Sequence, residues 1–169
     1  MVATDAGLVW LLLNYRLPRE PSTPRSAVWR KLKRLGVAQL GDGLVALPAD
    51  ARTQEQLEWV AEEITEAGGT STLWRAQLTS RTQERALIAG LARARADEYG
   101  AILDRATAAA ASSDQERVRT LRSLRGELRK VHRRDFFPPP ERDQARVAVQ
   151  ALVLVGENSA ATGQTQVTS

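Results

Sequence analysis

The sequence has 169 residues, of which 43% are hydrophobic and 26% are charged, a balance typical of a folded globular domain rather than a disordered or membrane-spanning chain. It contains no cysteine, which excludes disulfides, thiolate catalysis and cysteine-ligated metal sites and is compatible with a reducing cytoplasm. The net charge of +4 favours anionic partners, but basic helix surfaces are common and the charge alone decides little.

The first part of the chain begins with a strand and a helix. The apolar run from Leu8 to Tyr15 has the length of a buried strand and is too short to cross a bilayer, so we expect no signal peptide and no membrane span. Gly36 supplies the stop that typically follows a helix. Apolar residues at helical spacing predict that helix from Pro24 to Leu35: Val28, Trp29, Leu32 and Leu35.

A hairpin, a second helix and a last strand are expected next. Two short strands flank Gly41-Asp42-Gly43 between Val37 and Pro48, which predicts the hairpin. Thr53 is the expected N-cap of a helix that ends near Ala67, and Thr70 to Leu78 has strand composition. The order strand, helix, strand, strand, helix, strand predicts an α+β fold, a ferredoxin-like βαββαβ sandwich over residues 8–79, with both helices on one face of an antiparallel sheet.

After Thr79 the strand signals stop, and the sequence is rich in alanine, arginine and glutamate. Helices are expected over residues 80–111, 114–134 and 141–155, which together form a helical extension at 80–155. The break from Phe136 to Pro140 separates the last two. Residues 156–169 are small and polar, and we expect them to be a disordered tail.

Two basic helices are the candidate DNA-binding elements. Between Arg117 and Arg134 there are eight basic residues and one acidic residue. Such side chains can pair with phosphates, while a solvated helix face is the alternative interpretation. The glutamate-rich helix at Thr53 to Ala67 could neutralise one basic helix, within the chain or across a dimer, and both possibilities stay open. The candidate residues are Arg25, Arg30, Lys31, Lys33 and Arg34 in the first helix, and Arg119, Arg122, Arg129, Lys130, Arg133 and Arg134 in the second.

The apolar and aromatic residues give further expectations about packing. We expect Trp10, Trp29 and Trp74 in the core, and Val118 on the apolar side of the second basic helix. Trp59 lies on the glutamate-rich side of its helix, so we expect the C-terminal helices or a partner subunit to cover it.

No set of residues suggests catalysis or a bound cofactor. His132 is the single histidine and is expected to be structural. Without cysteine, a second histidine or an acidic pair at ligand spacing, we predict no metal site. No serine has a base nearby in the sequence and there is no glycine-rich phosphate loop, so we predict no catalytic residue.

The segments LLLNYRLPREPSTPRSAVWRKLKRLGVAQLGDGLVALP, QLEWVAEEITEAGG and RRDFFP, in this order, resemble the N-terminal domain of the ChrB family of chromate-resistance regulators. The likeness runs from about Val9 to Phe137 and beyond. It implies a cytoplasmic transcriptional regulator that binds operator DNA, forms a homodimer and has chromate as a candidate effector. Typical ChrB proteins continue into a second domain, and we expect no counterpart of that domain in this sequence. The alternative is therefore a non-catalytic interaction or accessory module of a chromate-resistance system.

The strand, proline-containing turn, basic helix and hairpin of the first of these segments also resemble the last domain of PaaX-type repressors and, more distantly, the small CRISPR-associated ferredoxin-like nuclease. In the nuclease relatives a metal-binding aspartate stands at the end of the first strand, where this sequence has Asn14. An amide binds Mg²⁺ poorly, so the resemblance does not extend to an enzyme.

Overall fold

The structure is a computed structural model that describes residues 7–163. The chain divides into two compact units, whose boundary falls between Leu91 and Ala92. Within the described range, no helix is both long enough and apolar enough to cross a bilayer.

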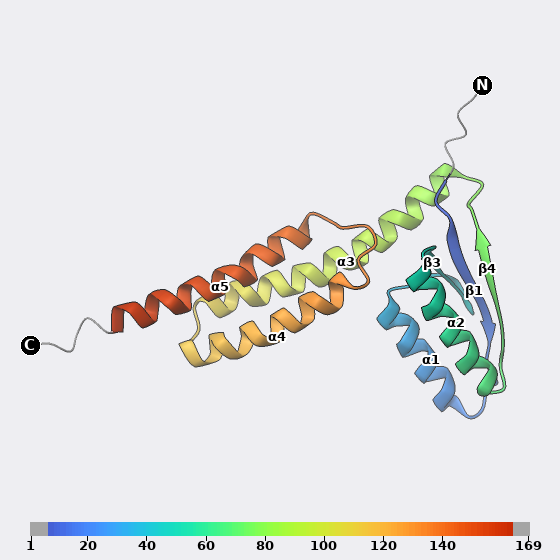
Figure 1. Cartoon of the computed structure of the whole chain (residues 1–169), viewed down its shortest axis with the longest axis horizontal. Helices are drawn as coiled ribbons and strands as arrows, with labels where there is room; N and C mark the ends of the chain where they lie inside the picture. The colour runs from blue at the N-terminus through green and yellow to red at the C-terminus, as the bar shows by residue number, and fades with distance from the viewer. Residues whose placement is uncertain (1–6, 164–169) are drawn as a thin grey trace, which may run out of the picture. The chain divides into compact units, whose positions relative to one another are not determined.

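The first unit contains a four-stranded antiparallel sheet with strand order β2-β3-β1-β4. Helices α1 and α2 lie side by side on one face of this sheet (Figure 1). This arrangement confirms the predicted α+β class and has the strand order of the ferredoxin-like sandwich. Its elements are β1 (Trp10–Arg16), α1 (Ser22–Leu35), β2 (Ala38–Gly41), β3 (Leu44–Pro48), α2 (Ala51–Glu66) and β4 (Thr70–Ala76).

The core of this unit forms between β1 and the two helices. Leu11 and Leu13 of the central strand are fully buried, as expected for alternate residues that face the covered side of a sheet. Side chains from both helices and from β3 complete the core: Val28, Leu32, Val45, Leu47, Leu57, Val60 and Ile64.

The helix ends follow capping chemistry, with one correction to the prediction. Gly36 ends α1 in the left-handed conformation at φ 76°, as the sequence indicated. Helix α2 is capped by Asp50 and not by Thr53. The Asp50 carboxylate accepts from the Thr53 backbone N–H at 2.7 Å, and the Thr53 hydroxyl accepts from the Asp50 N–H at 2.9 Å. Thr53 is thus the third helical residue of a capping box.

The expected burial of Trp74 is wrong, since its side chain is 56% exposed. Trp74 lies opposite Leu12 on β1, and directly opposite residues project from the same face of an antiparallel sheet. The neighbouring Arg75 donates to Gln54 of α2, which shows that Trp74 projects from the face opposite the helices. Strand β4 is also an edge strand, so fewer neighbours cover it. Trp10 is buried as expected, and Trp29 is half-buried.

Trp59 on α2 is 62% exposed, and it lines an open hollow together with Lys31 and Leu35 of α1. Its position on the helix explains the exposure, because Leu57, Val60 and Ile64 form the buried side of α2. Cover by a partner subunit stays a prediction.

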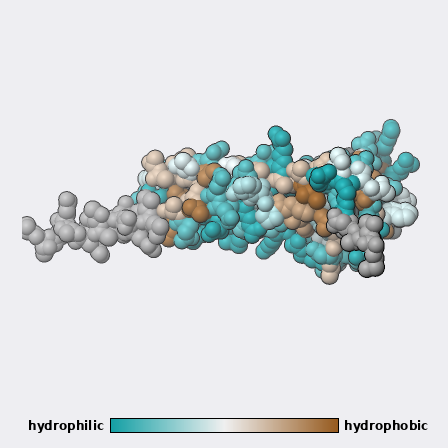
Figure 2. Space-filling model, turned by 90° about the horizontal axis from the view of Figure 1, so that it is seen from above, coloured by the Kyte–Doolittle hydropathy of each residue, from teal (hydrophilic) through white to brown (hydrophobic). Residues whose placement is uncertain are grey.

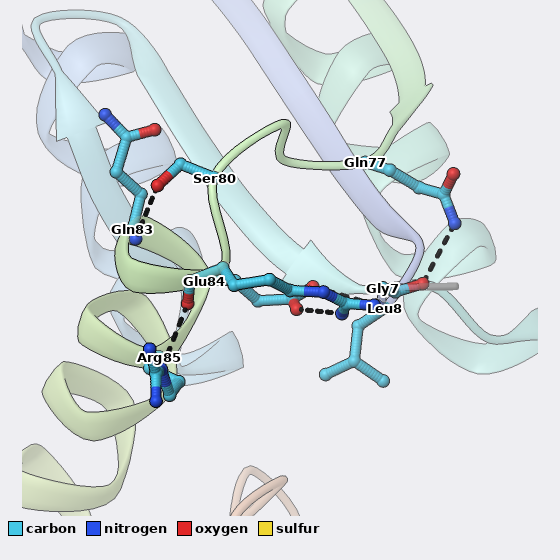
Figure 3. A network of polar contacts seen from close by, with 8 residues as sticks. Gly7, Leu8, Gln77, Ser80, Gln83, Glu84 and Arg85 are labelled. Carbon is cyan, nitrogen blue, oxygen red and sulfur yellow. Dashed lines mark hydrogen bonds and ion pairs between the residues drawn. The ribbon is translucent and has the colours of Figure 1, made fainter. Parts of the chain in front are cut away.

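The start of α3 (Arg81–Ala110) is tied to the start of β1 by polar contacts within the first unit (Figure 3). Glu84 is almost fully buried, and its carboxylate accepts from the Leu8 N–H at 2.8 Å and from Arg81 at 2.9 Å. Burial alone would raise the pKa of Glu84, but these hydrogen bonds outweigh it and lower the pKa below its ordinary value. Gln77 adds a bond of 2.9 Å to the Gly7 carbonyl.

The second unit contains the remainder of α3 together with α4 (Asp114–His132) and α5 (Glu141–Gly163). Helix α5 runs past residue 155, so residues 156–163 of the expected disordered tail are helical, in keeping with the high helix propensity of Ala160 and Ala161. Residues 164–169 of that tail lie outside the described residues. The three helices share one apolar core: Tyr99, Ile102, Ala106, Ala109, Leu124, Leu128, Val131, Ala145, Val149 and Leu152.

Val118 does not join this core and is 58% exposed, contrary to the prediction. At the helical rotation of about 100° per residue it lies about 120° around α4 from Leu124, beyond the arc that α3 and α5 cover.

Hydrophilic residues predominate on the face shown in Figure 2, and hydrophobic ones form separate patches there.

Candidate nucleic-acid interface

The exposed side of α4 carries a continuous row of cations. Leu124, Leu128 and Val131 bury the opposite side in the core of the second unit. Side chains three and four residues apart then share the solvent side. Its exposed basic residues are Arg119, Arg122, Arg125, Arg129, Lys130 and Arg133, and we call this set the α4 cationic face.

Arg125 is the member of this face that the sequence analysis missed. It stands three residues after Arg122 and four before Arg129, a spacing that places all three on one side of a helix. This spacing was the signal that could have identified it.

Apart from Arg133, the cations of the α4 cationic face have no ion-pair partner in the described part of the chain. Arg119, Arg122, Arg125, Arg129 and Lys130 form no ion pair within 4.0 Å with any described residue. Glu127, the acidic residue in the middle of α4, binds Arg105 of α3 at 2.5 Å, and this hydrogen bond lowers its pKa. From Arg119 to Lys130 the face extends over about 16 Å, at about 1.5 Å per residue.

Arg134, another predicted DNA contact, forms an ion pair within the second unit. Its guanidinium donates to Glu98 Oε2 at 2.6 Å, and its side chain is only 21% exposed. Glu98 also binds the buried Arg95 at 2.9 Å, and Arg95 reaches the Arg134 carbonyl at 3.4 Å. The structure therefore places Arg134 apart from the exposed cations of α4.

Helix α1 presents a smaller basic face, consisting of Arg30, Lys33 and Arg34, which we call the α1 cationic face. Arg30 is held by a bond of 3.3 Å to the Ser26 carbonyl. Lys33 Nζ lies 5.0 Å from the centroid of the Trp29 ring, a cation–π contact. All three side chains are exposed, and none forms an ion pair with a described residue.

Lys31 differs from its neighbours because its ammonium pairs with Glu63 of α2. The acidic helix thus neutralises one predicted site residue within the chain and leaves the α1 cationic face uncompensated. Arg25 is also separate, since its guanidinium donates to the Pro18 carbonyl at 2.9 Å.

Arg25 lines a cavity of about 600 Å³ beside the end of β1, together with Arg16, Tyr15, Trp29 and Asp42. A polar hollow of about 320 Å³ shares Tyr15, Arg16 and Asp42 with it. Both belong to the first unit. In the described part of the chain, no three histidine, aspartate or glutamate side chains gather as metal ligands would.

Comparisons with known proteins agree with the resemblance found in the sequence. The family model described as "Protein ChrB, N-terminal" matches residues 25–161. The protein named "Protein ChrB" from Cupriavidus metallidurans is 29% identical over 143 residues, which cover 76% of this chain and 40% of that relative. This chain thus spans well under half the length of the relative. No solved structure matches it.

Proposed function

This chain belongs to the ChrB family, and from that premise we propose that it is a chromate-resistance-associated transcriptional regulator that binds DNA through its basic helices. The α4 cationic face carries the proposal. Five of its cations form no ion pair with any described residue and stand on one side of α4, where they can follow the phosphates of a duplex.

The charge balance around α4 favours this function over a merely solvated surface. A helix that needs only solubility can intersperse charges of both signs, whereas the acidic residues of α4 lie in its first turn or bind another helix. Phosphate contacts of this kind give a salt-sensitive affinity that depends little on sequence.

We further propose that the protein acts in the cytoplasm as a homodimer, without an enzymatic activity of its own and with chromate as a candidate effector. The exposed Trp59 on α2 and the exposed Trp74 on the opposite face of the sheet each support a partner surface on the first unit, because large aromatic side chains are rarely left uncovered.

The test is an electrophoretic mobility shift with DNA from upstream of the protein's own gene at moderate salt. The variant Arg119→Gln/Arg122→Gln/Arg129→Gln removes three charges from the α4 cationic face, and we expect at least a tenfold loss of affinity. The control Arg85→Gln/Arg93→Gln/Arg146→Gln removes three exposed charges elsewhere and should bind nearly as the wild type does.

An alternative function is an accessory module that binds protein and not DNA. Absence of any DNA shift by the folded wild-type chain would favour it, as would equal binding by the α4 variant and its control. Detectable Mg²⁺-dependent DNA cleavage would contradict the non-enzymatic part of the proposal.

A further inference from the structure

The cavity beside the end of β1 has the composition of a ligand site and not of a surface irregularity. Its volume of about 600 Å³ falls in the usual range for small-molecule sites. Aromatic surface comes from Trp29 and Tyr15, positive charge from Arg16 and Arg25, and negative charge from Asp42.

Two charged residues of opposite sign in the cavity lining have no ion-pair partner among the described residues. Arg16 and Asp42 both line it, yet neither forms an ion pair within 4.0 Å with any described residue. Arg25 is oriented by the Pro18 carbonyl at 2.9 Å, which leaves its other N–H groups available. A ligand that carries both an anionic group and N–H donors would satisfy all three side chains.

Backbone contacts between the end of β1 and the hairpin turn hold one wall of the cavity in place. The Tyr15 N–H donates to the Gly43 carbonyl at 2.7 Å, which joins the end of β1 to the hairpin turn. An added Cβ on Gly43 would stand 2.2 Å from the Tyr15 carbonyl oxygen, so the turn approaches the strand as closely as glycine allows. The side of the site formed by β1 and the hairpin turn is therefore preorganised.

The adjoining hollow extends the site with hydroxyl groups. Thr70, Ser71 and Thr72 line it, and it shares Arg16 and Asp42 with the larger cavity. This combination suits a sugar and phosphate beside an aromatic-lined base site.

We propose that this cavity binds a guanine nucleotide unit, with the base against Trp29, the Asp42 carboxylate on the base and the phosphate on Arg16 and Arg25. An ionised carboxylate accepts two parallel hydrogen bonds. Guanine offers neighbouring N–H donors at its ring nitrogen and its 2-amino group, whereas adenine and cytosine offer only one amino group there. The inference goes beyond the proposed function, whose main support, the α4 cationic face, belongs to the other unit, although Arg25 and Trp29 of this cavity stand on the basic helix α1.

The nucleotide could be free or part of a single-stranded nucleic acid, and two arms of one experiment distinguish these sources. In the first arm, calorimetry on the full chain measures binding of GMP, AMP and inorganic phosphate. We expect GMP to bind at least tenfold more tightly than AMP. In the second arm, an eight-nucleotide dT strand with one internal dG is compared with the all-dT strand. Binding of the dG strand that is tighter than that of both GMP and the all-dT strand assigns the site to nucleic acid, and equal binding of the two strands with tight binding of GMP assigns it to the free nucleotide.

Variants test the assigned contacts. Asp42→Asn should abolish the preference for GMP over AMP, while Arg16→Gln should lower the affinity for both nucleotides at least tenfold. Asp104→Asn and Arg93→Gln change exposed residues outside the cavity and should alter neither affinity. Circular dichroism establishes that each variant is folded. Equal affinity for GMP and AMP, or full retention of the GMP preference in Asp42→Asn, would overturn the proposal.

Discussion

The Tyr99 hydroxyl donates a hydrogen bond of 2.9 Å to Asp135 Oδ2, which joins the middle of α3 to the turn that follows α4. The Asp135 side chain is fully buried, and Arg142 of α5 lies 3.7 Å from the same oxygen. This carboxylate therefore links all three helices of the second unit. Burial and the bond to Asp135 raise the pKa of Tyr99, so its hydroxyl stays protonated as the donor.

Tyr99→Phe should destabilise the second unit by about 1–3 kcal/mol, because it leaves a buried carboxylate with fewer partners. Urea denaturation followed by far-ultraviolet circular dichroism measures the effect. Thr107→Ala, which removes an exposed hydroxyl from the same helix, is the control and should cost less than about 0.5 kcal/mol. Equal stability of Tyr99→Phe and the wild type would mean that Arg142 alone satisfies Asp135.

The lowered pKa of His132 leads us to expect that the stability of the protein depends on pH. Burial lowers the pKa of its imidazole below the ordinary value of 6.5, and the Arg142 charge lowers it further. The folded protein thus binds a proton less readily than the unfolded chain, so stability is full above pH 6.5 and is lost as the pH falls through the folded pKa. Arg142, Asp135 and Tyr99 surround this ring.

His132→Gln should remove part of this pH dependence. We expect the loss of unfolding free energy between pH 7 and pH 5 to be smaller in the variant than in the wild type, because glutamine does not titrate. Urea midpoints at both pH values measure it, and the difference between the two proteins cancels the titration of carboxylates that they share. A larger loss in the variant would contradict the sign of the shift.

Alanine substitutions at the two glycines of the hairpin turn should have different effects on stability. Gly43 has φ of +71° and an added Cβ would meet the Tyr15 carbonyl, so Gly43→Ala should destabilise the first unit by more than about 1 kcal/mol. Gly41 has open space around it, and Gly41→Ala should be close to neutral. Thermal unfolding of both variants measures this, and equal melting temperatures would show that the turn can move away from β1.

The order of elements could be predicted because hydrophobic periodicity and turn residues are local properties. Gly36 and the Gly41-Asp42-Gly43 turn marked chain reversals correctly, and the apolar spacing of α1 identified its buried side. Trp74 was misplaced because its exposure depends on which sheet face the helices cover, and strand composition does not contain that information.

The candidate site was only partly predictable for a similar reason. Spacing identifies the residues that share a helix face, but not the side chains that arrive from other elements. Lys31 and Arg134 look like their basic neighbours in the sequence, yet Glu63 and Glu98 from distant positions pair with them. Ion pairs of this kind require the tertiary arrangement.

The α1 cationic face provides the last prediction. If Arg30, Lys33 and Arg34 each contact a phosphate, replacing all three with glutamine should weaken DNA binding and make it less sensitive to salt. The slope of log K against log salt should become less negative by about 0.9 per lost contact, or about 3 in total.

Lys31→Gln is the matched control for that experiment, because it removes a charge from the same helix that already pairs with Glu63. Its slope should equal that of the wild type, since a neutralised ammonium releases no counterion from DNA. Titrations by fluorescence anisotropy between about 50 and 200 mM salt measure these slopes. If the triple variant of α1 keeps the wild-type slope while the variant Arg119→Gln/Arg122→Gln/Arg129→Gln has a less negative slope, α4 contacts the DNA. In that case the α1 cationic face is only a solvated surface. If Lys31→Gln makes the slope less negative by about one-third of the change measured for the triple variant, the ion pair between Lys31 and Glu63 opens on DNA. In that case α1 binds DNA through all four cations.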